Sequence, residues 1–195
     1  MKTLTKNSIF CFISLFVMVM SACKKEKDDP NITQFTYNRT ITNPGAYPSS
    51  NVDSLDVNQD GAFDLYFIIE RETADSQYVA YEADHLALAL NDAPVFGGFK
   101  FAKLFSKGNM PPLYNAITEN YYTDNYISLI LDGVSYGADK KGNVYLAFGM
   151  KPSSSSSDIY YGWIQIAIAN DYSTIKCIDG AISDIPNKTI AIGSK

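Results

Sequence analysis

Residues 144 to 168 read VYLAFGMKPSSSSSDIYYGWIQIAI, and this stretch decides the fold class. Its first and last parts carry an apolar residue at every second position: Val144, Leu146, Phe148 and Met150, then Ile164, Ile166 and Ile168. Successive side chains of a β-strand point to opposite faces, so both parts are predicted to be strands with these residues in a core. The segment 151–157 between them is polar and low in complexity, which predicts an exposed loop.

Similar alternation recurs along the chain. Further strands are predicted at 33–41, 63–71, 78–90, 126–134, 174–182 and 188–193, with turns at Asp60-Gly61, Lys141-Gly142-Asn143 and Asp179-Gly180. No apolar pattern of helical period is long enough to predict a helix, although residues 99–106 could form a short one, and a long surface excursion is predicted at 106–125. Many short strands with turn-rich links favour a mostly β fold, either a single antiparallel β-sandwich or a barrel-like domain.

The N-terminus has the three parts of an export signal. Lys2 and Lys6 precede an apolar run at 9–20, and the small residues Ser21 and Ala22 follow it. The run of about twelve residues is shorter than the roughly 20 that a membrane-spanning helix needs. Residues 1–22 are therefore predicted to be a signal peptide that is removed.

The four residues Met20-Ser21-Ala22-Cys23 resemble the lipobox of bacterial lipoproteins. The resemblance implies cleavage before Cys23 and attachment of lipid to its sulfur, with acyl chains such as palmitate, although Leu is commoner than Met at the first position. Several acyl chains on one residue would hold the protein stably at a membrane. The alternative is an ordinary signal peptide with a cysteine near its cleavage site.

Residues 23–31 are predicted to form a tether, and residues 32–195 the β domain. The tether contains the charged run Lys-Lys-Glu-Lys-Asp-Asp at 24–29 and has no apolar core of its own. Such a segment behind a lipidated cysteine resembles the surface-export signal of Bacteroidota lipoproteins. The resemblance implies an outer-membrane protein on the cell surface, with the periplasmic face as the alternative.

The charge balance and the cysteines narrow the choice of partners. Removal of residues 1–22 takes away two of the 16 Lys and Arg and none of the 21 Asp and Glu, which leaves a formal charge of about −7. This acidity argues against nucleic acid and against an anionic membrane surface as partners. Cys11 leaves with the signal and Cys23 carries the lipid, so Cys177 has no partner for an intrachain disulfide and is expected in the core.

The segment from Asp56 to Asp64, DVNQDGAFD, has oxygen-bearing residues at the spacing of a calcium loop. The predicted ligands are the side chains of Asp56, Asn58, Asp60 and Asp64 and the carbonyl oxygen of Ala62. Phe67 stands where an EF-hand would need a bidentate Glu, so the loop resembles those between the strands of secreted bacterial proteins. A structural calcium ion is one interpretation, and a metal-free turn between two strands is the other.

The Asp56–Asp64 loop, together with the later strand Tyr161-Gly162-Trp163, resembles a loose class of exported Bacteroidota β proteins. The resemblance implies fold and export but no established activity. Trp163 is expected in the core, with a sugar-stacking platform as the alternative. Tyr121 and Tyr122 in the long excursion and Tyr126 directly after it are the candidate binding surface, with a solvated tyrosine-rich loop as the alternative.

The sequence gives little indication of catalysis. His85 is the sole histidine and no Gly-x-Ser-x-Gly motif is present. The first hypothesis is a non-enzymatic, lipid-anchored protein that binds a glycan or a protein. The second is a lipoprotein glycan hydrolase that uses paired carboxylates from among Glu70, Glu72, Glu82 and Asp84.

Overall fold

The computed structural model describes residues 29–46, 48–71, 77–83, 87–96, 99–114, 121–122, 125–131, 142–171 and 173–195. Strands in these ranges are β1 (Ile32–Thr42), β2 (Ser49–Leu55), β3 (Leu65–Arg71), β4 (Gln77–Ala83), β5 (Ala87–Phe96), β6 (Phe99–Ala102), β7 (Leu104–Phe105), β8 (Tyr121–Tyr122), β9 (Asn125–Leu131), β10 (Gly142–Met150), β11 (Tyr160–Ile168) and β12 (Thr174–Ser183). In β4, β5, β6, β8 and β9 the side chains described are those of Leu90 and Ala102.

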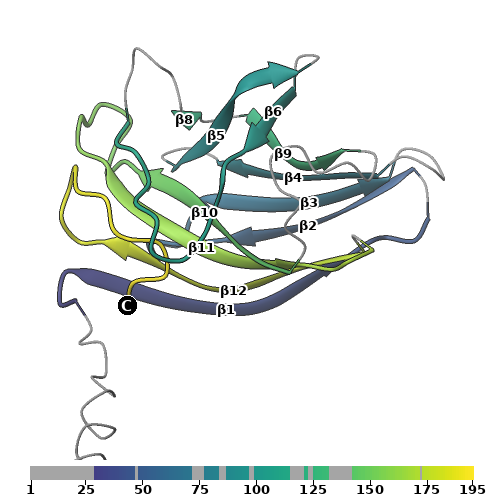
Figure 1. Ribbon diagram of the computed structural model, residues 1–195, viewed down its shortest axis with the longest axis horizontal. Coiled ribbons are helices and arrows are strands. Elements are labelled where there is room, and N and C mark those ends of the chain that lie inside the picture. The colour runs from purple at the N-terminus through teal and green to yellow at the C-terminus, as the bar shows by residue number, and fades with distance from the viewer. Residues whose placement is uncertain are drawn as a thin grey trace, which may run out of the picture.

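The strands follow the order β1-β12-β11-β10-β5-β6-β9-β4-β3-β2, with β7 paired to β10 and β8 to β5 (Figure 1). Neighbouring strands are antiparallel except for β6 and β9, which are parallel. None of the described residues is helical, and the sheet does not close on itself. The mostly β, antiparallel, sandwich-like fold is therefore confirmed. Residues 99–106 do not form the short helix that the sequence would allow, because β6 and β7 occupy this range.

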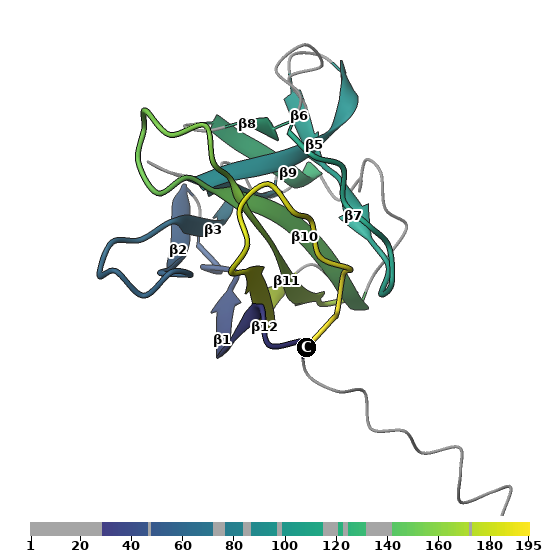
Figure 2. The ribbon, with the colours of Figure 1, turned by 90° about the vertical axis from the view of Figure 1, so that its left-hand side faces the viewer.

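The sheet bends so that its two halves face each other around one core. Viewed from the end, β1, β12, β11 and β10 lie opposite β2 and β3 (Figure 2). Buried side chains from both halves form the core cluster, among them Phe35, Leu55, Leu65, Phe67, Ile69, Leu146, Phe148, Ile164, Ile166 and Cys177. The predicted inward face of β10 and β11 is confirmed, since Leu146, Phe148, Ile164 and Ile166 are all buried.

A second apolar cluster lies on the other face of β10, β11 and β12. Tyr161 and Trp163 of β11 pack there with Phe105 and with Ile190 and Ile192 of the C-terminal segment. Trp163 is 1 % exposed and its ring meets that of Tyr145 edge-on, which confirms the core assignment. Because the segment after β12 covers this face, β11 is buried on both sides.

Two glycines allow the core to approach the backbone closely. A Cβ on Gly180 would lie 2.2 Å from Cε2 of Phe35 and 2.6 Å from the carbonyl oxygen of Trp163. A Cβ on Gly162 would lie 2.3 Å from Cζ of Phe148. The turn predicted at Asp179-Gly180 is wrong: these residues lie within β12, and Gly180 is there because an aromatic ring fills the space of its missing side chain.

The two end strands of the order, β1 and β2, meet through side chains. Arg39 Nη1 bonds Asp53 Oδ1 at 2.6 Å, and Asn51 Nδ2 donates to the carbonyl oxygen of Thr42 at 2.6 Å. Farther along the same line, the Tyr37 hydroxyl donates to the carbonyl oxygen of Asp56. We call this line of contacts the β1–β2 seam.

Several predicted boundaries differ from those observed. The strand expected at 78–90 is two strands, β4 and β5, and the strand expected at 188–193 is the non-strand segment that carries Ile190 and Ile192. The strand predicted at 63–71 begins only at Leu65, and Phe63, which precedes it, is 51 % exposed.

Candidate functional site

The candidate calcium loop connects β2 to β3 and is tightly turned. Gln59 and Gly61 have φ values of 62° and 94°, in the left-handed region that a glycine adopts most readily. The amide of Asp64 donates to the carbonyl oxygen of Leu55 at 2.8 Å and closes the base of the loop. The loop is thus an extension of the β2–β3 hairpin.

Three of the predicted ligands are brought together by hydrogen bonds to the loop itself. Asp56 Oδ2 accepts the amide of Gly61 at 2.9 Å, and Asp56 Oδ1 accepts the amide of Asp60 at 3.2 Å. Asn58 Oδ1 accepts the same amide at 3.0 Å, while Asn58 Nδ2 donates to Asp60 Oδ2 at 2.9 Å. Asp60 Oδ1 accepts the amide of Ala62 at 2.8 Å, so the side chains fix the turn without a metal.

The fourth ligand, Asp64, differs from the others because it is only 3 % exposed. Its Oδ2 accepts the amide of Val57 at 2.8 Å. Burial raises the pKa of Asp64 from 3.8 to about 6, the backbone amides of Val57 and Asn58 oppose the rise, and the negative charges of Asp60 and Asp56 add to it. Asp64 therefore lies within electrostatic reach of the two other carboxylates.

The loop could hold a cation only by drawing these oxygens further together. Among the described residues, no three or more Asp, Glu, His or Cys side chains are already arranged to hold a metal ion. Amide and carbonyl oxygens such as those of Asn58 and Ala62 are additional ligands that calcium accepts. What the loop offers is a concentration of negative charge at a rigid turn.

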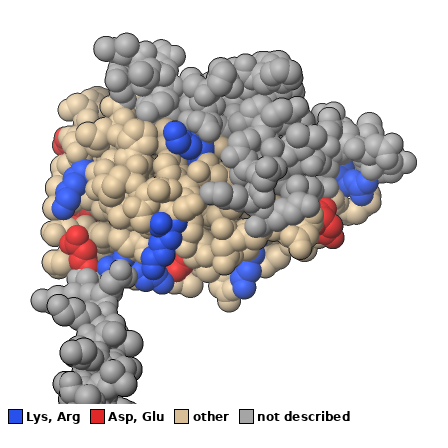
Figure 3. Space-filling model, viewed as in Figure 1, with Lys and Arg blue, Asp and Glu red and all other residues tan. Residues whose placement is uncertain are grey.

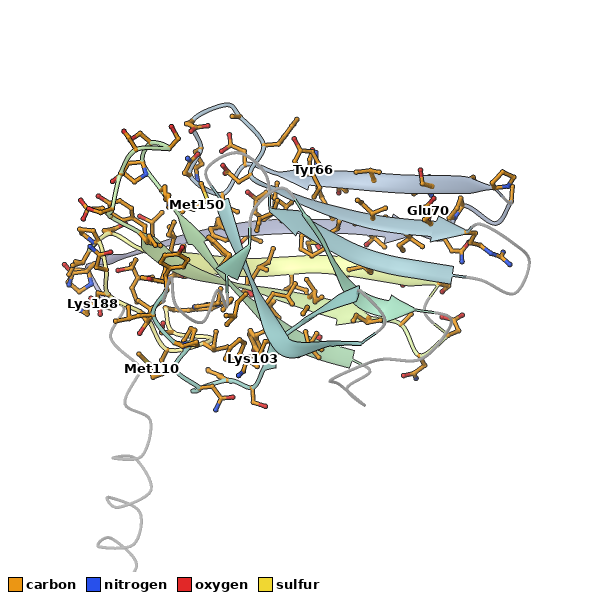
Figure 4. All side chains as sticks on the ribbon, turned by 90° about the horizontal axis from the view of Figure 1, so that it is seen from above. Tyr66, Glu70, Lys103, Met110, Met150 and Lys188 are labelled. Atoms are coloured by element: carbon orange, nitrogen blue, oxygen red, sulfur yellow. The ribbon has the colours of Figure 1, made fainter. Side chains whose placement is uncertain are left out.

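A pocket of about 470 Å³ lies beside this loop, at the end of the molecule where β1 begins. Its lining residues come from four parts of the chain: Thr33 of β1, then Val57, Asn58 and Gln59 of the loop, then Met150, Lys151, Pro152 and Tyr160, and finally Ile182, Ser183 and Asp184. Val57, Met150 and Ile182 are buried, so they form an apolar floor. Met150 is the last residue of β10 (Figure 4).

The polar residues around this pocket are held by the neighbouring backbone and side chains. Thr33 Oγ1 donates to Asp184 Oδ1 at 2.7 Å, and the buried Ser183 hydroxyl donates to the carbonyl oxygen of Ile185 at 3.0 Å. Asn187 Nδ2 donates to Asp158 Oδ1 at 2.9 Å, and this bond joins the loop between β10 and β11 to the segment after β12. The rim therefore combines hydroxyl, amide, carboxylate and ammonium groups over an apolar floor.

The pocket was not predicted from the sequence. Its residues come from segments more than 100 positions apart, and the pairing of β1 with β12 is what brings Thr33 to Asp184. The one local indication is the loop that contains Lys151 and Pro152, whose polar sequence predicts only that it is exposed. The four strands that meet here carry no recognisable motif at these positions.

Other predicted sites lie partly outside the described residues. Cys23, His85, Glu72 and Asp84 lie outside them entirely, and of Glu82 only the backbone is described. Tyr121 and Tyr122 form β8 and Tyr126 lies in β9, but their side chains are outside the described part of the chain. Glu70 lies on β3, toward the opposite end of the molecule from Met150 (Figure 4).

The chain matches no protein-family model, and comparisons with curated proteins and with solved structures gave no match. The described ranges also contain no helix of the length and apolarity that a membrane span requires.

Proposed function

We propose that this chain is a non-enzymatic, lipid-anchored protein of the bacterial outer membrane, displayed on the cell surface, that binds a short glycan. The pocket beside the Asp56–Asp64 loop is the observation that carries this proposal. Its volume of about 470 Å³ lies within the roughly 300–1,000 Å³ typical of ligand sites. An apolar floor under a rim of mixed donors and acceptors suits a sugar, which has apolar C–H faces and many hydroxyls.

The rim favours a neutral polar ligand over a strongly charged one. Lys151 and Asp184 contribute one charge of each sign, and the remaining rim groups are hydroxyls and amides of Thr33, Asn58 and Gln59. Such groups can both donate and accept hydrogen bonds. A protein ligand that inserts a polar side chain is the competing partner, and the experiment below separates the two.

The hydrolase hypothesis has less support. Glycoside cleavage by paired carboxylates needs two carboxyl groups about 5 to 9.5 Å apart. Among the described residues that line the pocket, Asp184 is the one carboxylate, and Thr33 already occupies one of its oxygens. We therefore favour binding without cleavage.

Glycan binding is tested with residues 23–195 carrying Cys23→Ser, which keeps every residue the structure describes. The expected result is selective binding on a glycan array, weakened about tenfold by Asp184→Ala, as expected for loss of a hydrogen bond of roughly 1.4 kcal/mol. Lys176→Ala is the control, because Lys176 is exposed on β12 outside the pocket. Binding to peptides alone, or equal binding by both variants, would contradict the proposal.

The lipid anchor is proposed from the lipobox resemblance and from the short apolar run before it. Metabolic labelling with a fatty-acid analogue should label the wild type and leave Cys23→Ala unlabelled. Label that persists in the variant would refute acylation at Cys23. Surface display is a separate outcome: protease added to intact cells should remove the domain, whereas protection until lysis would place the domain in the periplasm.

A calcium ion at the Asp56–Asp64 loop is also proposed, in a structural role. Its support is the mutual repulsion of Asp56, Asp60 and Asp64, which a cation would relieve. Calcium at one hundred times its Kd should add about 2.7 kcal/mol to the free energy of unfolding. Calorimetry should show a higher Tm with millimolar calcium than with chelator, and Asp60→Ala should remove most of the difference. Equal Tm values would identify the loop as a metal-free turn.

A further inference from the structure

Large apolar side chains are exposed on the segment that follows β7. Met110 and Leu113 are 57 % and 52 % exposed, although Pro111 between them is buried. The segment itself is held in place: Gly108 donates to the carbonyl oxygen of Ile192 at 2.8 Å, and Ile192 donates to that of Asn109 at 2.9 Å. Two apolar side chains are therefore presented to the outside by a fixed backbone.

The same part of the surface is where the described chain begins. The amide of Asp29 donates to the carbonyl oxygen of Lys195 at 3.1 Å, so the start of the domain is bonded to its end. Asp29, Lys107, Gly108 and Lys188 line one pocket of about 360 Å³. Met110 and Lys188 lie at the same end of the molecule (Figure 4). On the face that Figure 3 shows, Lys and Arg side chains are spread over the described surface, with Asp and Glu side chains among them.

The length of chain before Asp29 limits how far this end can lie from an anchor at Cys23. Asp29 is six positions after Cys23. Even a fully extended chain covers no more than about 3.6 Å per residue, or roughly 20 Å in all. With the lipid anchor at Cys23, Asp29, which lines this pocket, would lie within about 20 Å of Cys23.

We propose that the exposed segment carrying Met110 and Leu113 is a membrane-contact surface, which rests its apolar side chains in the interface of the bilayer to which Cys23 is anchored. This inference rests on the proposed lipid anchor and adds to it an orientation of the domain. Exposed apolar side chains beside lysines are typical of surfaces that lie in a membrane interface, since the lysine stems pack on apolar surface and their ammonium groups reach the headgroups. The overall acidity of the domain makes the contact apolar rather than electrostatic.

The experiment uses the lipidated chain reconstituted in phosphatidylcholine vesicles, with a fluorophore on Met110→Cys. Val52→Cys is the matched control, because Val52 is 55 % exposed on β2. We expect nitroxide-bearing lipid to quench the label at position 110 and aqueous iodide to quench it weakly, with the reverse at position 52. Cys177 does not interfere, since it is buried.

Each other outcome overturns the inference. Equal iodide quenching at positions 110 and 52 would show that the segment stays in water. Protection from both quenchers, or protection in detergent without vesicles, would indicate a partner protein or a second copy of the chain. Mass spectrometry of the N-terminal peptide reports acylation of Cys23 separately. A missing acyl group would refute both the lipid anchor and the membrane contact. An acylated chain whose label at position 110 stays exposed to water would refute the membrane contact alone.

Discussion

Strands β11 and β2 are both antiparallel members of the same sheet, yet their surroundings differ. Strand β11 has Ile164 and Ile166 in the core between the two halves of the sheet, and Tyr161 and Trp163 under the C-terminal segment. Strand β2 buries Leu55, whereas Val52 is 55 % exposed. Alternation in sequence therefore reports one face of a strand, while burial of the other face depends on which distant segment covers it.

The largest loss of stability is expected from a change in the core beside β11. Phe148→Ala on β10 removes a fully buried ring that fills the space left by Gly162. We expect the free energy of unfolding to fall by about 3 to 5 kcal/mol, measured by urea denaturation. A loss well below 1 kcal/mol would mean that the core around β11 refills the cavity and is not closely packed.

Gly180→Ala tests the close packing of the core by adding an atom where Phe148→Ala removes a ring. The added Cβ overlaps the Phe35 ring and the carbonyl oxygen of Trp163, and the backbone oxygen cannot turn away as a side chain can. Overpacking of this kind costs about 1 to 3 kcal/mol. Gly45→Ala is an instructive companion, because its Cβ would meet nothing within 4 Å and only its φ of 75° opposes the change. Equal stability of the wild type and Gly180→Ala would contradict the predicted overlap.

Asp64 links the exposed loop to the buried core, and its pKa gives a testable pH dependence. The folded-state pKa of about 6 exceeds the ordinary 3.8, so between these values the folded chain binds more protons than the unfolded chain. The contribution of Asp64 to stability therefore decreases as the pH rises from about 4 to 6. In chelator, Asp64→Asn should lack this decrease. Parallel stability curves for the variant and the wild type would show that Asp64 titrates normally.

The smallest effect is expected at the β1–β2 seam. Arg39→Ala removes the contact with Asp53, and the Arg39 side chain is 54 % exposed, so solvent screens the pair. We expect a loss of about 0.2 to 1 kcal/mol, reduced further in high salt. A loss as large as that for Phe148→Ala would mean that the seam is as important to stability as the core.

The sequence predicted the strands whose apolar residues alternate strictly. Residues 144–150 and 164–168 are correct in position and inward face because each has a buried partner face on a neighbouring strand. Strand β2 was missed because residues 49–55 contain only two apolar residues, Val52 and Leu55, and its pairing with β3 leaves no local pattern in the sequence. Gly180 was wrongly assigned to a turn. In the sequence, a glycine that leaves room for an aromatic ring, here that of Phe35, cannot be distinguished from a glycine that permits a turn.

The candidate site was predictable only where its residues are contiguous. The spacing of Asp56, Asn58 and Asp60 indicated their convergence, and the structure does bring these three side chains together. The inward turn of Asp64 depends on Leu55 and Val57, whose burial is a property of the folded core. The pocket beside the loop needs the register between β1 and β12, which no local pattern specifies.

That register pairs the first strand of the domain with the last, Ile32 opposite Ser183 and Thr42 opposite Thr174. A contact between positions so far apart in sequence closes a very long loop, and its entropic cost must be met before the contact contributes any stability. During synthesis, β1 therefore emerges about 140 residues before β12, the strand with which it pairs. Until then the edge that β1 presents to β12 is unpaired, and an unpaired strand edge makes a partly folded chain prone to aggregation.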